Sequence, residues 1–299
     1  MEIKDLLLAN LGKNGHVDTL PIVREFYTLF WGERLETNEP DDFNGLVNSM
    51  YTGETIISFN TIAGCMIRLL SDFIDGNRSI VVPPTKDPEC QTKRLDIITD
   101  PIHANEIPEE VKDNFRKFYY IYHTPANLMP LGHGLNGFRS RINHDFPDSF
   151  LKAVKCDCYP RPENAINTDS MIKFNKWEDY FMKFKTWTEY IEMNYLQPFF
   201  EDSEQTAYSI YVQLAPSSDM CMPWNEKCAK CMSHTDKVLA KKHIRHFLCN
   251  AIRIIENRAD LLAIEFKKIL SSNEKGANGF VENLRKHIDE AEKSERRKK

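Results

Sequence analysis

Between residues 119 and 151 the sequence places a dense set of His, Asn, Arg and Asp side chains around two glycine turns, after an apolar run typical of a strand. Side chains that bind or transform ligands often lie on such turns, held by a rigid scaffold. The segment therefore contains the candidate catalytic residues, which are His123, Asn136, Arg139 and Asp148.

The chemistry that this set favours is metal-assisted hydrolysis of a phosphodiester. A histidine can act as general base while Asn and Asp side chains help to hold Mg²⁺ or Zn²⁺. The stretch around His123 also resembles the second half of some HNH-type nuclease domains, in which a His/Gly-Asn-Leu strand precedes an asparagine near a turn. A clear upstream catalytic histidine is missing, because His103 is too close in the sequence.

A structural role for the same residues is the alternative. Asp148 can cap the helix predicted to follow it, Arg139 can pair with that carboxylate, and Asn136 suits a turn. The sequence alone leaves both interpretations open, and with them the question of whether the protein is an enzyme.

A second cluster, at residues 221–234, has the spacing of metal ligands. Cys228 and Cys231 form a Cys-x2-Cys pair that can present two thiolates to one Zn²⁺, and Cys221 with His234 would complete a tetrahedral Cys₃His set. Because all four ligands would come from the protein, we expect a structural zinc rather than a catalytic one. The alternative is a loop with reduced, partly buried thiols.

A long helix predicted near the C-terminus has a basic face over residues 237–258. Such a face can neutralise phosphates, so nucleic acid is a candidate partner. The opposing interpretation is an ordinary solvated helix side, since no aromatic stacking platform is interleaved. The basic residues are Lys237, Lys241, Lys242, Arg245, Arg253 and Arg258.

The elements that must position these groups are mostly helices. We predict helices over residues 18–31 and 173–195, the second with an aromatic stripe. The strongest signal is at residues 236–270, where apolar residues recur at spacings of three and four. A helix of that length spans about 50 Å at 1.5 Å per residue. A gap at residues 276–279 is then expected before a charged amphipathic helix.

The predicted fold class is therefore mainly α: an irregular helical domain with a few short strands and a long C-terminal helix. We expect one domain over residues 1–272, with a sub-division near residues 160–172 as the alternative. Residues 273–299 are predicted to be a charged helical tail.

Composition limits the class of protein. The net charge of −5 over 299 residues argues against a protein that coats nucleic acid by bulk charge. The sequence shows no secretory signal and no apolar run long enough to span a bilayer, so we expect no membrane partner. Eight cysteines without an export signal favour reduced thiols and a soluble, cytoplasmic protein.

Several motifs together resemble an uncharacterised bacterial family, a domain of unknown function, over roughly residues 18–262. The chain has Ala126-Asn127 where that family usually has Gly-Gly or Gly-Asn, and Ser140 where it has Gly. The resemblance implies a cytosolic helical protein and carries no established activity. It rests on Phe30-Trp31-Gly32-Glu33-Arg34-Leu35, Asn136-Gly137-Phe138-Arg139, Asp145-Phe146-Pro147-Asp148, the aromatic region Trp177–Phe200 and Ile255-Glu256-Asn257-Arg258.

Two functions follow as hypotheses. The first is a protein with a polar site at residues 123–148, with phosphodiester hydrolysis as the first reaction to test. The second is a non-catalytic interaction module, stabilised by zinc at the cysteine cluster, that uses the long helix as its partner surface.

Overall fold

The computed structural model describes residues 2–12, 17, 20–35, 51–55, 109–132, 135, 150–151, 154–155, 158–159, 177–200 and 234–296. For residues 51–55, 178–179, 234–247 and 295–296 it describes the backbone alone. The described residues are mainly α-helical, as the sequence predicts. In chain order the elements are α1 (Ile3–Leu7), α2 (Pro21–Leu35), β1 (Tyr51–Thr55), α6 (Glu109–Ile121), the 3₁₀ turn η3 (Pro125–Asn127), β2 (Leu128–Gly132), α9 (Glu178–Met182), α10 (Trp187–Met193), the 3₁₀ turn η7 (Gln197–Phe199), α12 (His234–Ser272) and α13 (Glu274–Arg296).

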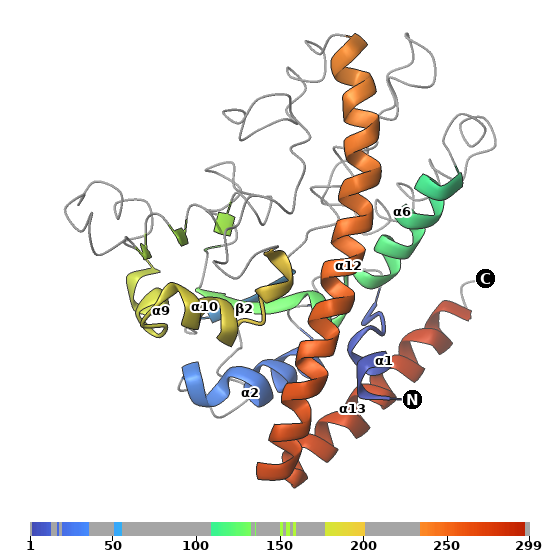
Figure 1. Cartoon of the computed structure of the whole chain (residues 1–299). Coiled ribbons are helices and arrows are strands. Elements are labelled where there is room, and N and C mark those ends of the chain that lie inside the picture. Colours follow the sequence, from blue (N-terminus) through green and yellow to red (C-terminus); the bar gives the residue numbers. More distant parts are fainter. Residues whose placement is uncertain are drawn as a thin grey trace.

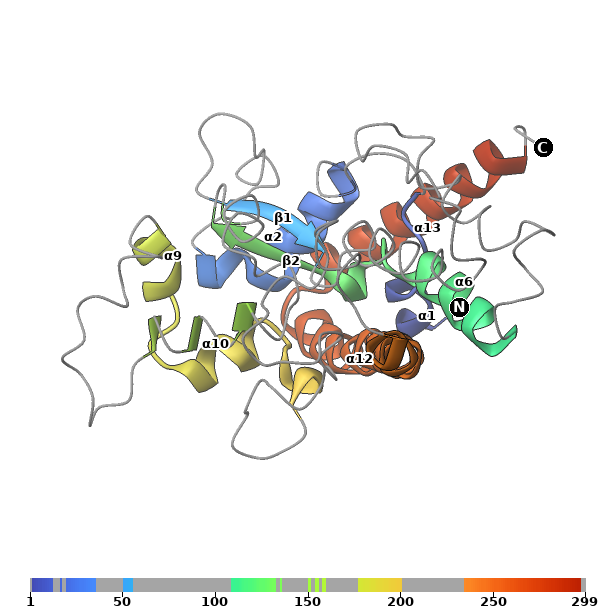
Figure 2. The same cartoon turned by 90° about the horizontal axis from the view of Figure 1, so that it is seen from above.

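Helix α12 runs through the described structure, with the other helices packed around it. Its 39 residues confirm the predicted long helix and extend it by two residues at each end. At 1.5 Å per residue it is about 58 Å long. Figures 1 and 2 place α2, β1, β2, α9 and α10 on one side of α12, and α1, α6 and α13 on the other.

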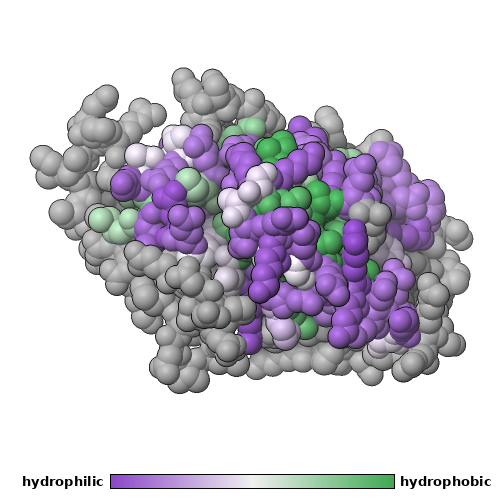
Figure 3. Space-filling view, turned by 90° about the horizontal axis from the view of Figure 1, so that it is seen from below, coloured by the Kyte–Doolittle hydropathy of each residue, from purple (hydrophilic) through white to green (hydrophobic). Residues whose placement is uncertain are grey.

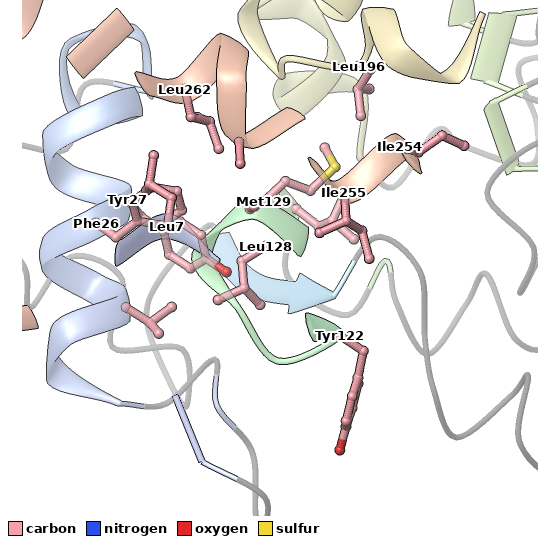
Figure 4. Packing of buried hydrophobic residues seen from close by; sticks show 14 of the residues in the cluster. Leu7, Phe26, Tyr27, Tyr122, Leu128, Met129, Leu196, Ile254, Ile255 and Leu262 are labelled. Atoms are coloured by element: carbon pink, nitrogen blue, oxygen red, sulfur yellow. The ribbon is translucent and has the colours of Figure 1, made fainter. Parts of the chain in front are cut away.

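The predicted apolar spacing of α12 forms a buried stripe. Leu248, Ile255 and Leu262 are each at most 1% exposed, and Ile269 is half-buried against the core. Figure 4 shows Ile255 and Leu262 facing Leu7 from α1, Phe26 and Tyr27 from α2, and Leu128 and Met129 from β2. The hydrophobic core thus joins elements far apart in the sequence.

The prediction of one aromatic helix over residues 173–195 is wrong for its described part. The chain bends after α9, and α10 starts with its own cap: the Thr186 hydroxyl accepts from the Glu189 amide at 3.1 Å. The Glu189 carboxylate in turn accepts from the Lys185 amide at 2.7 Å. These two local bonds satisfy amides at the new helix start, which ends the continuous helical pattern. The stripe of α12 packs mainly on α1, α6, α13 and η3, and meets this aromatic region through η7.

A two-stranded antiparallel ribbon leads into the polar segment. Strand β2 coincides with the apolar run of the sequence and pairs with β1 from Tyr51↔Gly132 to Thr55↔Leu128. The Tyr180 hydroxyl donates to Pro130 O at 3.0 Å. At Gly132 a Cβ atom would lie 2.7 Å from Trp177 Cδ1, so this close approach requires glycine.

Helix α13 differs from the predicted tail at its start. The expected gap at residues 276–279 is wrong, because Asn273 alone separates the two helices. Its Oδ1 accepts from the Gly276 amide at 3.0 Å, as an N-cap residue does. Ala277, Phe280, Leu284 and Ile288 are buried, and the Phe280 ring stacks on Phe26 with centroids 6.0 Å apart, so α13 belongs to the core.

The surface of the described part is mostly polar. Figure 3, which views it from below, shows a limited hydrophobic area surrounded by hydrophilic residues. In the described ranges, no helix is both long and apolar enough to cross a membrane. The large hydrophobic side chains that are exposed there are Tyr120, Met182, Met193 and Ile264.

Candidate functional site

His123, the first candidate catalytic residue, holds the N-terminal segment in place. Its ring Nδ1 lies 3.0 Å from Gly12 O, and since a carbonyl can only accept, Nδ1 carries the proton. Its backbone oxygen accepts from the Leu11 amide at 2.9 Å. Its ring lies against Tyr122 with centroids 3.7 Å apart, and the residue is 6% exposed. When neutral, this imidazole keeps its lone pair on Nε2.

The same segment is held by a second histidine from the other end of the chain. His287 on α13 donates from Nε2 to Leu11 O at 2.8 Å. Asn10 donates from its side chain to Tyr120 O at 2.6 Å and accepts from the Gly12 amide at 2.8 Å. Gly12 has φ +143°, a conformation that favours glycine. His123 and His287 therefore bond to adjacent carbonyls and tie residues 10–12 to α6 and α13.

Two buried side chains fix the chain where it passes from α6 to the polar segment. The Thr124 hydroxyl donates to Ile121 O at 2.7 Å. The Asn127 amide donates to Tyr122 O, also at 2.7 Å. Both residues are at most 1% exposed. These two bonds fix η3 and thereby the direction in which β2 begins.

The remaining candidate residues lie largely outside the described part. This holds for Asn136, Arg139 and Asp148, and for Cys221, Cys228 and Cys231. His234 is the first residue of α12, but its side chain is not described. The described residues therefore test neither predicted set, and both sets stay predictions. In the ranges that are described, no group of three or more His, Cys, Asp or Glu side chains is arranged to hold a metal ion.

Arg258 is a buried polar centre that the sequence analysis places on the wrong face. Its side chain is 1% exposed, and its guanidinium donates to three backbone oxygens. Nη1 bonds to Ala126 O at 2.6 Å, Nη2 to Asn194 O at 3.1 Å and Nε to Tyr195 O at 3.1 Å. The basic face predicted over residues 237–258 thus loses its last member. Arg253, five residues earlier, is exposed.

Two of the three oxygens that Arg258 binds, those of Asn194 and Tyr195, belong to a strained helix end. After α10 the Tyr195 amide donates to Glu192 O at 3.1 Å and the Leu196 amide to Ile191 O at 2.9 Å. This is the Schellman pattern, which usually places glycine where Tyr195 stands with φ +55°. A cation at a helix C-terminus also interacts favourably with the helix dipole.

Burial controls the protonation of this centre. It lowers the pKa of Arg258 to about 9, while the nearby Tyr195 and Tyr27 hydroxyls act in the opposite direction. Burial raises the pKa of Tyr195 above its ordinary range, and Glu265 adds to that effect. Within the described residues no carboxylate pairs with Arg258, so the three backbone carbonyls compensate its charge.

Other contacts at this centre join motifs of the family resemblance. Trp31 Nε1 donates to Met193 O at 2.8 Å, and Arg34 pairs with Glu189. The aromatic motif of α2 thereby packs on α10, and α10 is bound by Arg258 of α12. This structural role was not predicted, although Arg258 lies three residues after Ile255 and four before Leu262, positions that share the buried stripe.

Comparison with known proteins gives no further guide. No protein-family model, no curated protein and no solved structure matches this chain. Function must therefore be argued from the geometry and charges of the chain itself.

Proposed function

We propose that the chain is a non-catalytic interaction module that binds nucleic acid through the N-terminal half of α12. The observation that carries the proposal is the charge distribution along this one helix. Residues 236–253 contain five Lys or Arg residues and one Asp, whereas the chain as a whole has a net charge of −5. A local concentration of positive charge favours contact with phosphates even in an acidic protein.

Two acidic residues of α6, Glu109 and Asp113, pair with basic residues of α6 itself. The first turns of α6 carry Glu109, Glu110 and Asp113, and Glu109 and Asp113 pair within that helix. Lys112 pairs with Glu109 at 2.5 Å, and Arg116 pairs with Glu109 at 3.1 Å and with Asp113 at 2.7 Å. These pairs support the proposal, because the two carboxylates are bound by cations of their own helix.

The position of the helix end supports the same proposal. In Figure 1 the N-terminal end of α12 extends past α6 and the other labelled helices. The residue types at the spacing of the buried stripe also change there, from apolar to basic. Lys241 and Lys237 precede Ile244 by three and seven residues, so they continue the three-and-four spacing with charged side chains. By sequence spacing, the helix face that is apolar along the core is therefore basic toward the N-terminus of α12.

Zinc at Cys221, Cys228, Cys231 and His234 would fit this role, because the cluster leads directly into α12. A structural ion there would fix the first turn of the basic helix. Metal analysis of the purified protein tests this part, and Cys228→Ser should release the metal. A protein that contains no zinc contradicts it.

Binding is tested by fluorescence anisotropy with a labelled DNA duplex and a labelled single-stranded RNA, at several salt concentrations. Lys241→Glu/Lys242→Glu should weaken binding at least tenfold and lower the salt dependence, because fewer counterions are released. The matched control is Lys267→Glu/Lys268→Glu, which makes the same charge change at the other, exposed end of the helix. Absence of binding at low salt, or an equal loss in both variants, contradicts the proposal.

Metal-assisted phosphodiester hydrolysis at residues 123–148 is the second candidate. What favours it is the Nδ1 bond of His123 to Gly12 O, since this fixes the tautomer in which Nε2 can accept a proton. Its 6% exposure argues for the structural role, because a general base must reach the substrate. Incubating the same nucleic acids with Mg²⁺ or Mn²⁺ separates the two functions. Cleavage that is lost in His123→Ala at unchanged melting temperature would favour the enzyme.

A further inference from the structure

Arg258 bonds to two segments of the chain, and each segment precedes one of the two candidate sites in the sequence. Ala126, which it binds, lies in η3 just before β2 and the polar segment. Asn194 and Tyr195, which it also binds, end α10, after which the chain continues toward the cysteine cluster. We infer that Arg258 couples two segments, residues 122–132 and 190–200, so that they unfold locally and refold together.

The geometry of the side chain makes the coupling specific. A guanidinium is planar and presents its N–H donors in a fixed fork, so one orientation serves all three oxygens. The oxygens of Asn194 and Tyr195 lie at the C-terminal end of α10, where helix carbonyls lack partners within the helix. If either segment moves away, the Arg258 guanidinium loses one or two of its hydrogen-bond acceptors. Because the side chain is 1% exposed, water does not replace them. The free energy of each segment thus depends on the other.

The other bonds in this region hold each segment separately. Thr124 and Asn127 bond to oxygens within six residues of themselves and fix η3 locally. Trp31 and Arg34 hold α10 to α2. Among the described residues, Arg258 is the side chain that donates to both segments at once, so its removal tests coupling rather than local order.

Hydrogen exchange measured by mass spectrometry tests the inference in the full chain. In Arg258→Met the amides of residues 122–132 and 190–200 should exchange at least tenfold faster, by similar factors, while those of α13 stay as in the wild type. Arg258→Lys, with one point charge in place of the fork, should give a smaller increase that again affects both segments. Arg253→Met, an exposed residue of the same helix, is the matched control and should change neither.

Two results would overturn the inference: faster exchange in one segment alone, or a uniform increase that includes α13. If Arg258→Met does not fold, the Arg258→Lys comparison decides the question by the same criteria. Neither outcome depends on nucleic-acid binding, so the inference stands or falls independently of the proposed function.

Discussion

The two halves of α12 differ in the role of their basic residues. From Leu248 onward the helix buries an apolar stripe, and its arginine at position 258 lies inside the core, bonded to backbone oxygens. Before Leu248 the same spacing carries Lys241 and Lys237, and positive charge accumulates toward the helix end. The part from Leu248 onward is a scaffold of the fold, whereas the part before it is distinguished in the sequence by its basic residues.

The comparison shows that position on the helix, rather than residue type, decides what a basic side chain does. Arg253 and Arg258 are five residues apart, which places them on different sides of the helix. Arg253 is exposed and lies 3.3 Å from the Asn250 side-chain oxygen, while Arg258 is 1% exposed. A count of basic residues alone treats the two as equivalent.

The largest expected effect is at Arg258. Arg258→Ala removes the donors of three buried oxygens, and each unsatisfied group costs about 1–3 kcal/mol. Partial relaxation and the removal of a buried charge offset some of this, so we expect a loss of about 3–5 kcal/mol in the free energy of unfolding. Arg253→Ala is the control and should cost about 0.5 kcal/mol or less. Urea denaturation measures both, and equal losses would remove the distinction drawn between the two arginines.

Two isoleucines on the same helix sharpen the contrast between buried and exposed faces. Ile255→Ala creates a cavity in the hydrophobic core and should cost about 2–5 kcal/mol. Ile264→Ala changes a side chain that is 55% exposed and should cost about 0.5 kcal/mol or less. Similar urea midpoints for the two variants would contradict the assignment of the buried stripe.

Much of the fold was predictable where the pattern is local and long. The spacing of α12 repeats over many turns, so its limits were predicted to within two residues. The strand β1 was not predicted, because its partner β2 lies some eighty residues away and pairing at that distance leaves no local pattern. The break before α10 and the start of α13 were missed because the caps at Thr186 and Asn273 are single residues within strong helical patterns.

The candidate site was predictable only in part. His123 lies in a turn after α6, and its contact with Gly12 joins residues 111 positions apart, which cannot be seen from spacing. Asn136, Arg139 and Asp148 stay predictions. Arg258, by contrast, carried a readable signal, since its spacing from Ile255 and Leu262 places it on the buried face.

A smaller effect is expected where α12 gives way to α13. Asn273→Ala removes the side chain that accepts from the Gly276 amide and should cost about 1 kcal/mol, whereas Asn273→Gly should cost a few tenths. Because α13 packs against α2, the loss should appear in the same cooperative transition as Ile255→Ala. A separate early transition, followed by circular dichroism, would mean that α13 is not part of the scaffold that distinguishes the C-terminal half.

The smallest effect concerns pH, and it reports on the surroundings of Arg258. Burial raises the pKa of Tyr195 above its value in the unfolded chain, so the folded state keeps its proton where the unfolded state loses it. The stability that this difference contributes is fully present below pH 10 and declines as the pH rises further. Tyr195→Phe removes the hydroxyl, so stability should change little at pH 7 and should decline less steeply above pH 10 than in the wild type. Urea unfolding at pH 7, 10 and 11 measures the slopes. Parallel slopes would mean that the Tyr195 hydroxyl is as accessible to water as in the unfolded chain, and that the C-terminal half of α12 is less enclosed than its buried arginine indicates.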